Sequence, residues 1–271
     1  MSSLPVVLTI AGSDNSAGAG IQADLKTMCA LGVYGVTALT CVVAEVPGKV
    51  MAIQAVTPEI VREQIRLLFK AFPIAAIKTG MLYSLEIVQA VCAGIELGRV
   101  TQEVPAGLVV DPVMIATAGT RLLKEEALAV YRERLFPAAT LVTPNLDETA
   151  VLLGRAVTNR EEMVLAGQEL VSEYRAAFLV KGGHLTGEVA ADLLVSADGE
   201  MEWLEAPFVR GVSSHGTGCT YSAAIAAGLG KGLSLRGAVR EAKVYLSRAL
   251  SGFVRWERAD GITDALNHFA D

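Results

Sequence analysis

Short apolar runs alternate along this chain with longer amphipathic stretches. The apolar runs, which we predict to be strands, span residues 6–11, 36–43, 74–78, 108–110, 140–142 and 178–180. Apolar spacing predicts helices over 21–31, 58–72, 84–97, 124–135, 147–153, 160–174, 217–230 and 234–256. A hairpin is predicted over 190–195 and 201–205, around Asp198-Gly199. Strand–helix alternation predicts an α/β fold whose mostly parallel sheet is covered by helices on both faces.

Composition narrows the class of protein further. The chain has 271 residues, of which 52% are hydrophobic and 19% charged, with neither a repeat nor a low-complexity linker. We therefore expect a single domain over residues 1–271. A net charge of −6 without a Lys/Arg cluster argues against nucleic acid as a partner. No apolar run reaches the ~20 residues of a membrane span, and the N-terminus lacks a signal-peptide pattern. The 4 cysteines show no C-x-x-C spacing, as expected for reduced thiols in a cytoplasmic protein.

The segment Gly216-Thr217-Gly218-Cys219 leads directly into a predicted helix rich in small residues. A glycine turn at a helix N-terminus presents free backbone N–H groups, which bind phosphate or a developing anion. Cys219 falls in the first helical turn, where we expect the pKa of its thiol to be lowered so that it can act as a base. A tight turn before a buried helix, with Cys219 as a core residue, is the structural alternative.

Polar and flexible residues follow several other predicted strands. They form the segments 11–20, 111–114, 143–148 and 181–184. In sheets of this kind the ligand crevice lies at the carboxyl ends of the strands. The segment 11–20 lacks both the Walker A pattern and the G-x-G-x-x-G of dinucleotide folds, so alone it indicates only a tight turn. Together the segments predict a ligand site at one edge of the sheet.

Eight motifs occur in order over nearly the whole chain. They are Thr9-Ile-Ala-Gly-Ser-Asp14, Gly18-Ala-Gly-Ile-Gln-Ala-Asp-Leu-Lys-Thr27, Leu31-Gly-Val-Tyr-Gly35, Lys78-Thr-Gly-Met81, Asp111-Pro-Val-Met114, Thr143-Pro-Asn145, Lys181-Gly-Gly-His184 and His215-Gly-Thr-Gly-Cys219. With them the chain resembles the hydroxymethylpyrimidine/phosphomethylpyrimidine kinases of thiamine biosynthesis, within the ribokinase-like superfamily. The resemblance implies a three-layer α/β/α sandwich and a homodimer.

The resemblance also implies an activity and its cofactors. The γ-phosphoryl group of ATP would pass to the hydroxymethyl oxygen of 4-amino-5-hydroxymethyl-2-methylpyrimidine and then to the resulting monophosphate, with Mg²⁺ on the phosphates. Phosphoryl transfer of this kind depends on positioning and on charge stabilisation.

The residues that match the family's catalytic and nucleotide positions have these implied roles. Gly216, Thr217 and Gly218 form the anion hole, and Cys219 is the general base. Lys181, Asn145 and Lys243 bind the nucleotide, while Glu148 and Asp111 serve the metal. A carboxylate favoured at a helix N-terminus is the alternative for Glu148, and a helix-surface position is the alternative for Lys243.

The implied substrate site combines apolar residues with a few polar ones, as suits a flat heteroaromatic ring. Its residues are Gly12, Ala19, Asp24, Val43, Glu45, Met81 and Val113. Core packing is the alternative for Met81 and Val113. For Asp24 the alternative is complementation of the helix dipole.

The chain departs from the family pattern at three positions. Glu45 stands where the family usually has Gln, and an ionised Glu can only accept hydrogen bonds. We hypothesise that Glu45 pairs with a protonated aminopyrimidine or is itself protonated. Thr117 replaces a common Lys and Ser214 a common Thr, which puts contacts between the flap after Met114 and phosphate in doubt.

Other functions stay open at this point. Pyridoxal kinases resemble the same family, although Ala116-Thr117-Ala118 lacks the second cysteine that dual-activity members often carry. Cys219 in place of the usual Asp disfavours a sugar kinase. A non-catalytic pyrimidine-binding homologue would be expected to lose one of the implied catalytic residues, and none is lost. We expect His215 and His184 to form hydrogen bonds within their turns rather than to bind metal.

Overall fold

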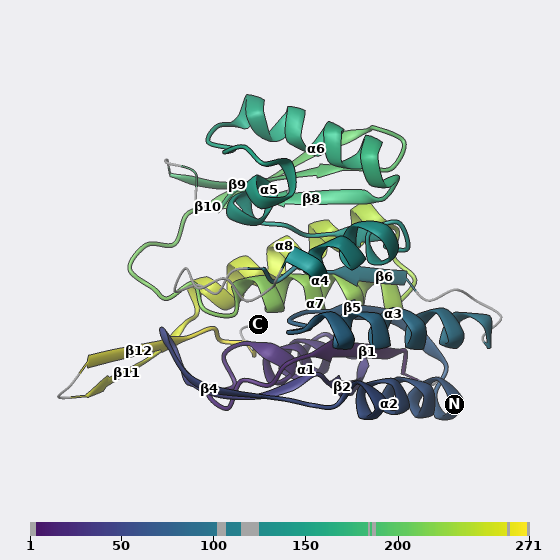
Figure 1. The fold of residues 1–271 in the computed structure, drawn as a ribbon. Helices are drawn as coiled ribbons and strands as arrows, with labels where there is room; N and C mark the ends of the chain where they lie inside the picture. The colour runs from purple at the N-terminus through teal and green to yellow at the C-terminus, as the bar shows by residue number, and fades with distance from the viewer. Residues whose placement is uncertain are drawn as a thin grey trace.

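A computed structural model of the chain describes residues 4–101, 107–114, 125–183, 185, 188–258 and 261–269. The strands are β1 (Val6–Ala11), β2 (Tyr34–Leu39), β3 (Cys41–Val46), β4 (Lys49–Ala55), β5 (Ile74–Thr79), β6 (Gly107–Val110), β7 (Leu141–Val142), β8 (Ala177–Lys181), β9 (Val189–Val195), β10 (Met201–Pro207), β11 (Val254–Arg258) and β12 (Gly261–Ala265). An 8-stranded sheet has the order β10-β9-β8-β7-β6-β5-β1-β2 (Figure 1). Within this sheet each neighbouring pair in the row β8-β7-β6-β5-β1-β2 is parallel. The β9–β10 hairpin continues the sheet beyond β8 with antiparallel pairing.

Helices cover both faces of this sheet (Figure 1). They are α1 (Gly20–Ala30), α2 (Pro58–Ala71), α3 (Leu85–Val100), α4 (Glu125–Val130), α5 (Leu146–Leu153), α6 (Arg160–Tyr174), α7 (Thr217–Gly230) and α8 (Leu235–Ser251), with a π-helical turn at Tyr131–Leu135 after α4. Successive residues of β1 face opposite cores: Leu8 packs in the core that contains α2 to α6, and Val7 in the core that contains α1, α7 and α8. The predicted three-layer α/β/α arrangement is confirmed.

The apolar run at 36–43 is two strands rather than the single predicted one. β2 ends at Leu39, and Thr40 then donates from its side chain to the carbonyl oxygen of Met81 at 2.7 Å. After this break, β3 leaves the main sheet and pairs antiparallel with β4, which the sequence did not predict. A continuous apolar run carries no information about a change of pairing partner, and this is why the prediction was wrong here.

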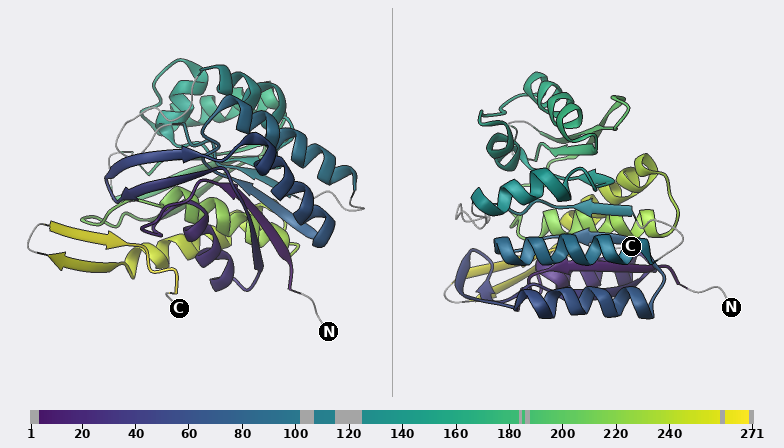
Figure 2. Two further views of the ribbon diagram at one scale, coloured as in Figure 1. Left: turned by 60° about the horizontal axis from the view of Figure 1, so that its bottom comes forward. Right: turned by 45° about the vertical axis from the view of Figure 1, so that its right-hand side comes forward.

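The predicted helix over 234–256 is also too long. α8 ends at Ser251, and Val254–Arg258 forms β11, which pairs with β12. Arg255 on β11 lies 2.7 Å from Asp264 on β12, so the charged residues at this end of the chain stabilise a strand pair. The β3–β4 and β11–β12 ribbons both extend from the same end of the molecule (Figure 2).

This end is the carboxyl edge of the parallel strands, where the segments that follow β1, β5, β6, β7 and β8 come together. Within the described part of the chain, no helix has the length and apolar composition that a membrane span requires.

A close contact between α2 and α3 makes the helix layer testable. A Cβ added at Gly98 would lie 2.3 Å from the ring of Phe69. We predict that Gly98→Ala destabilises the protein by about 1–3 kcal/mol through overpacking, although alanine favours a helix over glycine by about 1 kcal/mol. In a Phe69→Leu background the same substitution should cost much less. Urea unfolding of the four proteins measures this difference, and an equal cost in both backgrounds would contradict the packing argument.

Candidate active site

Two glycine-containing loops meet at the carboxyl edge of the sheet. Gly216, the N-cap of α7, has a φ of 81°. A Cβ on Gly216 would lie 1.8 Å from the carbonyl oxygen of Gly18, in the loop between β1 and α1. Glycine alone tolerates both this φ and this contact. The residues from Gly216 to Cys219 are partly exposed, so the N-terminus of α7, where helices bind anions, lies at the surface. The N–H of Thr217 already donates to the carbonyl oxygen of Ser214 at 3.2 Å.

An ion pair that the sequence analysis missed joins the same two loops. His215 Nε2 lies 2.8 Å from Asp14 Oδ2, and the two side chains are 13% and 1% exposed. The hydrogen bond that His215 donates to Asp14 raises the pKa of His215 above its ordinary value. Burial would raise the pKa of Asp14, but hydrogen bonds from His215 and Ser16 hold it well below its usual range. The backbone N–H of His215 bonds within its turn, to Ser213 Oγ, whereas its ring reaches across to the other loop.

Cys219 lies in the first turn of α7, as predicted, but the pKa of its thiol is not lowered. The residue is partly exposed, yet its sulfur is enclosed by protein, and this burial raises the thiol pKa to about 11. The charge of Lys78 and a hydrogen bond from the backbone N–H of Gly20 act in the opposite direction without cancelling the effect. The expectation of an acidic thiol was therefore wrong, because desolvation outweighs the helix terminus. At neutral pH the thiol in this structure carries its proton.

Lys181 and Asp111 lie beside the anion-binding corner. Lys181 Nζ is 3.0 Å from Asp111 Oδ1, and the Asp111 carboxylate also accepts from Thr143 and Ser222, each at 3.3 Å. A Cβ on Gly218 would lie 3.4 Å from Lys181 Nζ and 3.5 Å from Asp111 Oδ2. Burial alone would lower the pKa of Lys181, but the charge of Asp111 raises it. A charged ammonium group therefore lies next to the N–H groups of α7.

Asn145 and Glu148 form the N-terminal cap of α5. Asn145 Oδ1 accepts from the backbone N–H of Glu148 at 2.8 Å, and Glu148 Oε2 accepts from that of Asn145 at 2.9 Å. Glu148 is thus the helix N-terminal carboxylate that the sequence allowed as an alternative. Burial, assisted by the charge of Asp111, raises the pKa of Glu148 to about 7.

Asp111 and Glu148 fit a site for Mg²⁺. Their negative charges act on each other, so a divalent cation between the phosphates and these carboxylates would relieve the repulsion. Oxygen is the donor that Mg²⁺ prefers, and Mg²⁺ usually keeps several waters. No group of three or more His, Cys, Asp or Glu residues gathers anywhere in the described ranges, so the two carboxylates suit a hydrated ion better than a fully protein-ligated one.

Asp24 pairs with a buried lysine rather than lining an accessible surface. Lys78 Nζ lies 2.9 Å from Asp24 Oδ1 and 2.8 Å from Oδ2, and Thr9 Oγ1 donates to Oδ2 at 2.6 Å. Both charged side chains are 0% exposed. Burial would lower the pKa of Lys78, but the charge of Asp24 raises it above the ordinary value. A substrate contact to Asp24 would require one of these hydrogen bonds to be exchanged, and the pair also contributes charge beneath Cys219.

The apolar residues of the predicted substrate site cluster near the first loop. A Cβ on Gly12 would meet Cys41 Sγ at 2.7 Å and Met81 Cε at 2.9 Å, so the backbone of this loop lies directly against both side chains. The Cα of Ala19 would lie 3.5 Å from a Cβ on Gly216. Val113 follows Asp111, and both Met81 and Val113 are partly exposed rather than enclosed in the core.

Val43 and Glu45 are attached to the same loop through backbone hydrogen bonds. The N–H of Val43 donates to Ser13 Oγ at 3.1 Å, and that of Glu45 donates to Asn15 Oδ1 at 2.6 Å. Burial, with the charge of Asp14, raises the pKa of Glu45 above its usual value. This direction agrees with the hypothesis that a proton is shared at Glu45.

Lys243 is not on the helix surface. Its Nζ lies 2.7 Å from Asp192 Oδ2 and 3.1 Å from the carbonyl oxygen of Ala190. Asp192 Oδ1 in turn accepts from the N–H of Gly182 at 3.0 Å. The Lys243 ammonium is thus held by β9, and through Asp192 it supports the segment that follows Lys181.

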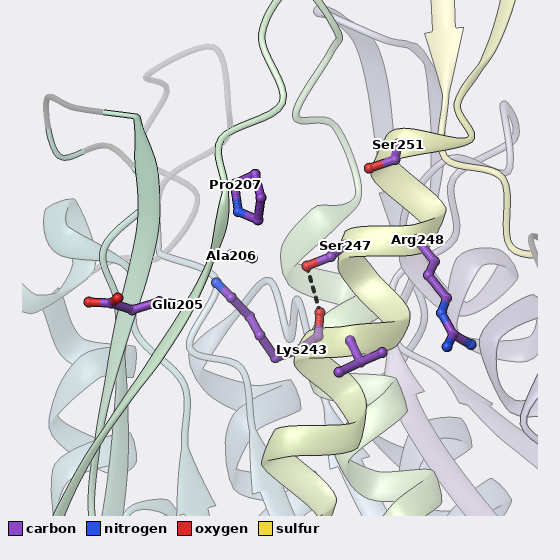
Figure 3. Close-up of a pocket in the computed structure, with 8 residues that line it drawn as sticks. Glu205, Ala206, Pro207, Lys243, Ser247, Arg248 and Ser251 are labelled. Carbon is purple, nitrogen blue, oxygen red and sulfur yellow. Dashed lines mark hydrogen bonds between the residues drawn. The ribbon is translucent and has the colours of Figure 1, made fainter.

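A hollow of ≈ 330 Å³ opens beside Lys243, between the end of β10 and the last turns of α8 (Figure 3). It is lined by Glu205, Ala206, Pro207, Lys243, Val244, Ser247, Arg248 and Ser251. Lys243 points from α8 toward the strands, whereas Arg248 points away from them (Figure 3).

The sequence analysis missed Lys78 and Asp192 as well as Asp14. One available signal was the position of Lys78 within an apolar run predicted to be a buried strand, because a buried lysine requires a carboxylate partner. Thr117 and His184 lie outside the described residues.

The chain resembles known proteins both in sequence and in fold. The chain is 43% identical over 266 residues to the hydroxymethylpyrimidine/phosphomethylpyrimidine kinase of Rhizobium meliloti (strain 1021), covering 97% of each protein. It resembles the crystal structure of phosphomethylpyrimidine kinase from Clostridium difficile 630, with 37% identity, a TM-score of 0.78 and coverage of 90% of this chain and 99% of that one. An ADP complex of Bacillus subtilis pyridoxal kinase gives 33% identity, a TM-score of 0.87 and coverage of 99% and 98%. A sequence profile described as phosphomethylpyrimidine kinase matches residues 14–264, and the chain therefore belongs to the phosphomethylpyrimidine kinase family.

Proposed function

We propose that this protein transfers the γ-phosphoryl group of ATP to 4-amino-5-hydroxymethyl-2-methylpyrimidine and then to its monophosphate, in thiamine biosynthesis. The Rhizobium meliloti relative is named for these two kinase activities. The observation that carries the proposal is the corner where the partly exposed N-terminus of α7 lies beside Lys181 and Asp111. Such a corner suits phosphoryl transfer, which requires alignment and stabilisation of spreading negative charge.

Each part of the corner has a role in this proposal. The N–H groups from Gly216 to Gly218 hold the oxygens of the transferring group, and Lys181 neutralises charge on the nucleotide phosphates. Asn145 lies at the start of α5, on the nucleotide side. The hollow next to Lys243 is the place that we propose for the nucleoside part of ATP, and the ADP complex of the Bacillus subtilis relative supports a nucleotide site in this fold.

Asp111 and Glu148 would hold Mg²⁺. When bound, the ion would neutralise phosphate charge and orient the terminal phosphoryl group. Lys181 already pairs with Asp111 Oδ1, so its positive charge offsets part of the negative charge of Asp111.

Cys219 is proposed as the group that removes the proton from the acceptor hydroxyl. With a thiol pKa of about 11, it must first lose its own proton. Lys78 and the N–H of Gly20 favour the thiolate and would assist this loss. The acceptor ring would lie among Gly12, Ala19, Val43, Met81 and Val113, with Glu45 as its polar partner.

Phosphorylation of pyridoxal or pyridoxine is a second candidate function. The specific observation in its favour is the TM-score of 0.87 with a pyridoxal kinase. A non-catalytic pyrimidine-binding role is disfavoured because the chain keeps Lys181, Asn145, Glu148 and the Gly-Thr-Gly turn.

We also propose that the protein is a cytoplasmic homodimer with one domain. Apolar side chains at Val42, Val46 and Met51 are exposed on the β3–β4 ribbon, as expected of a surface that a second copy covers.

Replacement of the sulfur tests both the reaction and the base. We predict that wild-type protein releases ADP with either pyrimidine, more slowly with pyridoxal or pyridoxine, and that Cys219→Ser lowers kcat by about 10²- to 10⁴-fold. Because the thiol pKa is about 11, wild-type kcat/KM should rise by about tenfold per pH unit between pH 7 and 9, following the thiolate fraction of the free enzyme. A coupled ADP-release assay measures these rates. A flat wild-type profile, or a variant with full activity, would contradict the base role.

A second prediction concerns Glu45. If a proton is shared between Glu45 and the ring, affinity for the pyrimidine should fall as pH rises, because the shared proton is lost. Glu45→Gln, whose amide donates and accepts at every pH, should remove this dependence and bind about tenfold more tightly at the alkaline end, the worth of one hydrogen bond. The KM for the pyrimidine across pH measures the effect. An unchanged pH profile and affinity would end the hypothesis.

A further inference from the structure

Three consecutive residues in the loop between β1 and α1 are bonded to two different parts of the site. Ser13 Oγ accepts from the N–H of Val43, and Asn15 Oδ1 accepts from that of Glu45, so both attach the loop to β3. Asp14, between them, pairs instead with His215, immediately before the N-cap of α7. This short segment is therefore the direct connection between the proposed pyrimidine side of the site and the anion-binding corner.

Both carboxylate oxygens of Asp14 accept hydrogen bonds from groups in the two loops. Oδ1 accepts from the N–H and the hydroxyl of Ser16, each at 2.7 Å. Oδ2 accepts from the N–H groups of Gly18 at 3.2 Å and Ala19 at 2.8 Å, in addition to His215. The Asp14 side chain is 1% exposed. Its hydrogen bonds hold it in one orientation, so it does not turn toward a ligand.

Two further contacts join the same loops beside the ion pair, one of them through the His215 ring. A Cβ on Gly18 would lie 2.8 Å from Cδ2 of the His215 ring, and a Cβ on Gly216 would lie 1.8 Å from the Gly18 oxygen. The two loops therefore touch on both sides of the Asp14–His215 bond. A change at this bond would move the α7 N–H groups relative to the first loop.

We propose that Asp14 and His215 are positioning residues, which hold the N–H groups of α7 in line with the acceptor held by the first loop and β3. The inference rests on the proposed kinase function and extends it. Neither residue needs to touch substrate for this role. A displacement of about 1 Å between reacting groups can cost about 10²-fold in rate, so loss of the pair should reduce kcat far more than it weakens either substrate.

The charges around His215 favour a stable pair. The groups that act on the His215 charge are the carboxylate of Asp14 and that of Glu45 on β3. Both are negative when ionised, and they favour the protonated form of the ring by raising its pKa, the hydrogen bond to Asp14 having the largest effect. The carboxylates of Asp14 and Glu45 repel each other, and the positive charge of the protonated His215 ring offsets this repulsion.

The test uses the full-length protein with Asp14→Asn, His215→Gln, His215→Ala and the double variant Asp14→Asn/His215→Gln. We expect each single variant to lower kcat by about 10- to 100-fold, with Kd values for the pyrimidine alone and for ATP alone changed less than about threefold. His215→Gln, which keeps an N–H donor, should retain more activity than His215→Ala. The double variant should be no slower than the slower single variant, because both remove the same contact.

The matched control is His268→Gln. His268 is buried and bonds through Nε2 to Thr220 of α7 at 3.1 Å, so it tests the general effect of losing a histidine that contacts this helix. We expect its kcat to remain within about twofold of wild type. Calorimetry supplies the two Kd values, and thermal unfolding identifies variants that fail to fold.

Three outcomes would overturn the positioning role: unchanged kcat in all three single variants, multiplicative losses in the double variant, or parallel losses of kcat and of both binding affinities. If Asp14→Asn fails to fold, His215→Gln still decides between the first and third outcomes, since its kcat and its two Kd values are measured separately; if His215→Gln fails, Asp14→Asn does the same. Failure of the proposed function would be seen separately, as absence of pyrimidine turnover by the wild-type protein.

Discussion

The site depends on contact between two backbone segments that lie far apart in the chain. A side chain at Gly216 would collide with the backbone of Gly18, a side chain at Gly18 would press on the His215 ring, and Asp14 pairs with His215 across 201 residues of sequence. This contact places the N-terminus of α7 beside the loop that leaves β1. The other proposed components, including Lys181, Asp111 and the α5 cap, lie at strand ends that the parallel sheet already brings to this edge.

Buried lysine–carboxylate pairs support this edge at successive places. Lys78 pairs with Asp24, Lys181 with Asp111, and Lys243 with Asp192. Removing one partner of such a pair typically costs about 3–5 kcal/mol, because the other charge is left buried and uncompensated. The pairs therefore fix charges in place before any ligand binds. Lys181, 14% exposed, is the most accessible lysine of the three, and its position beside Gly218 suits contact with phosphate.

Cys219 illustrates how the environment of a residue changes its chemistry. Its position in the first turn of α7 was correctly predicted, and a helix N-terminus normally favours a thiolate. Enclosure of the sulfur has the larger effect and keeps the proton on. The N–H of Gly20 and the charge of the buried Lys78 favour the thiolate, but their effect is smaller than that of burial.

The sequence by itself determined the fold class, the family and the segments that meet at the carboxyl edge of the sheet, because strand periodicity and glycine motifs are local properties. It could not determine where the run after Leu39 leaves the main sheet, or that residues after Ser251 pair as strands, since both depend on which distant segment supplies the partner. The same limit explains Asp14, Lys78 and Lys243. Each is an ordinary charged residue in the sequence, and only the tertiary structure decides which opposite charge it meets and whether water can reach the pair.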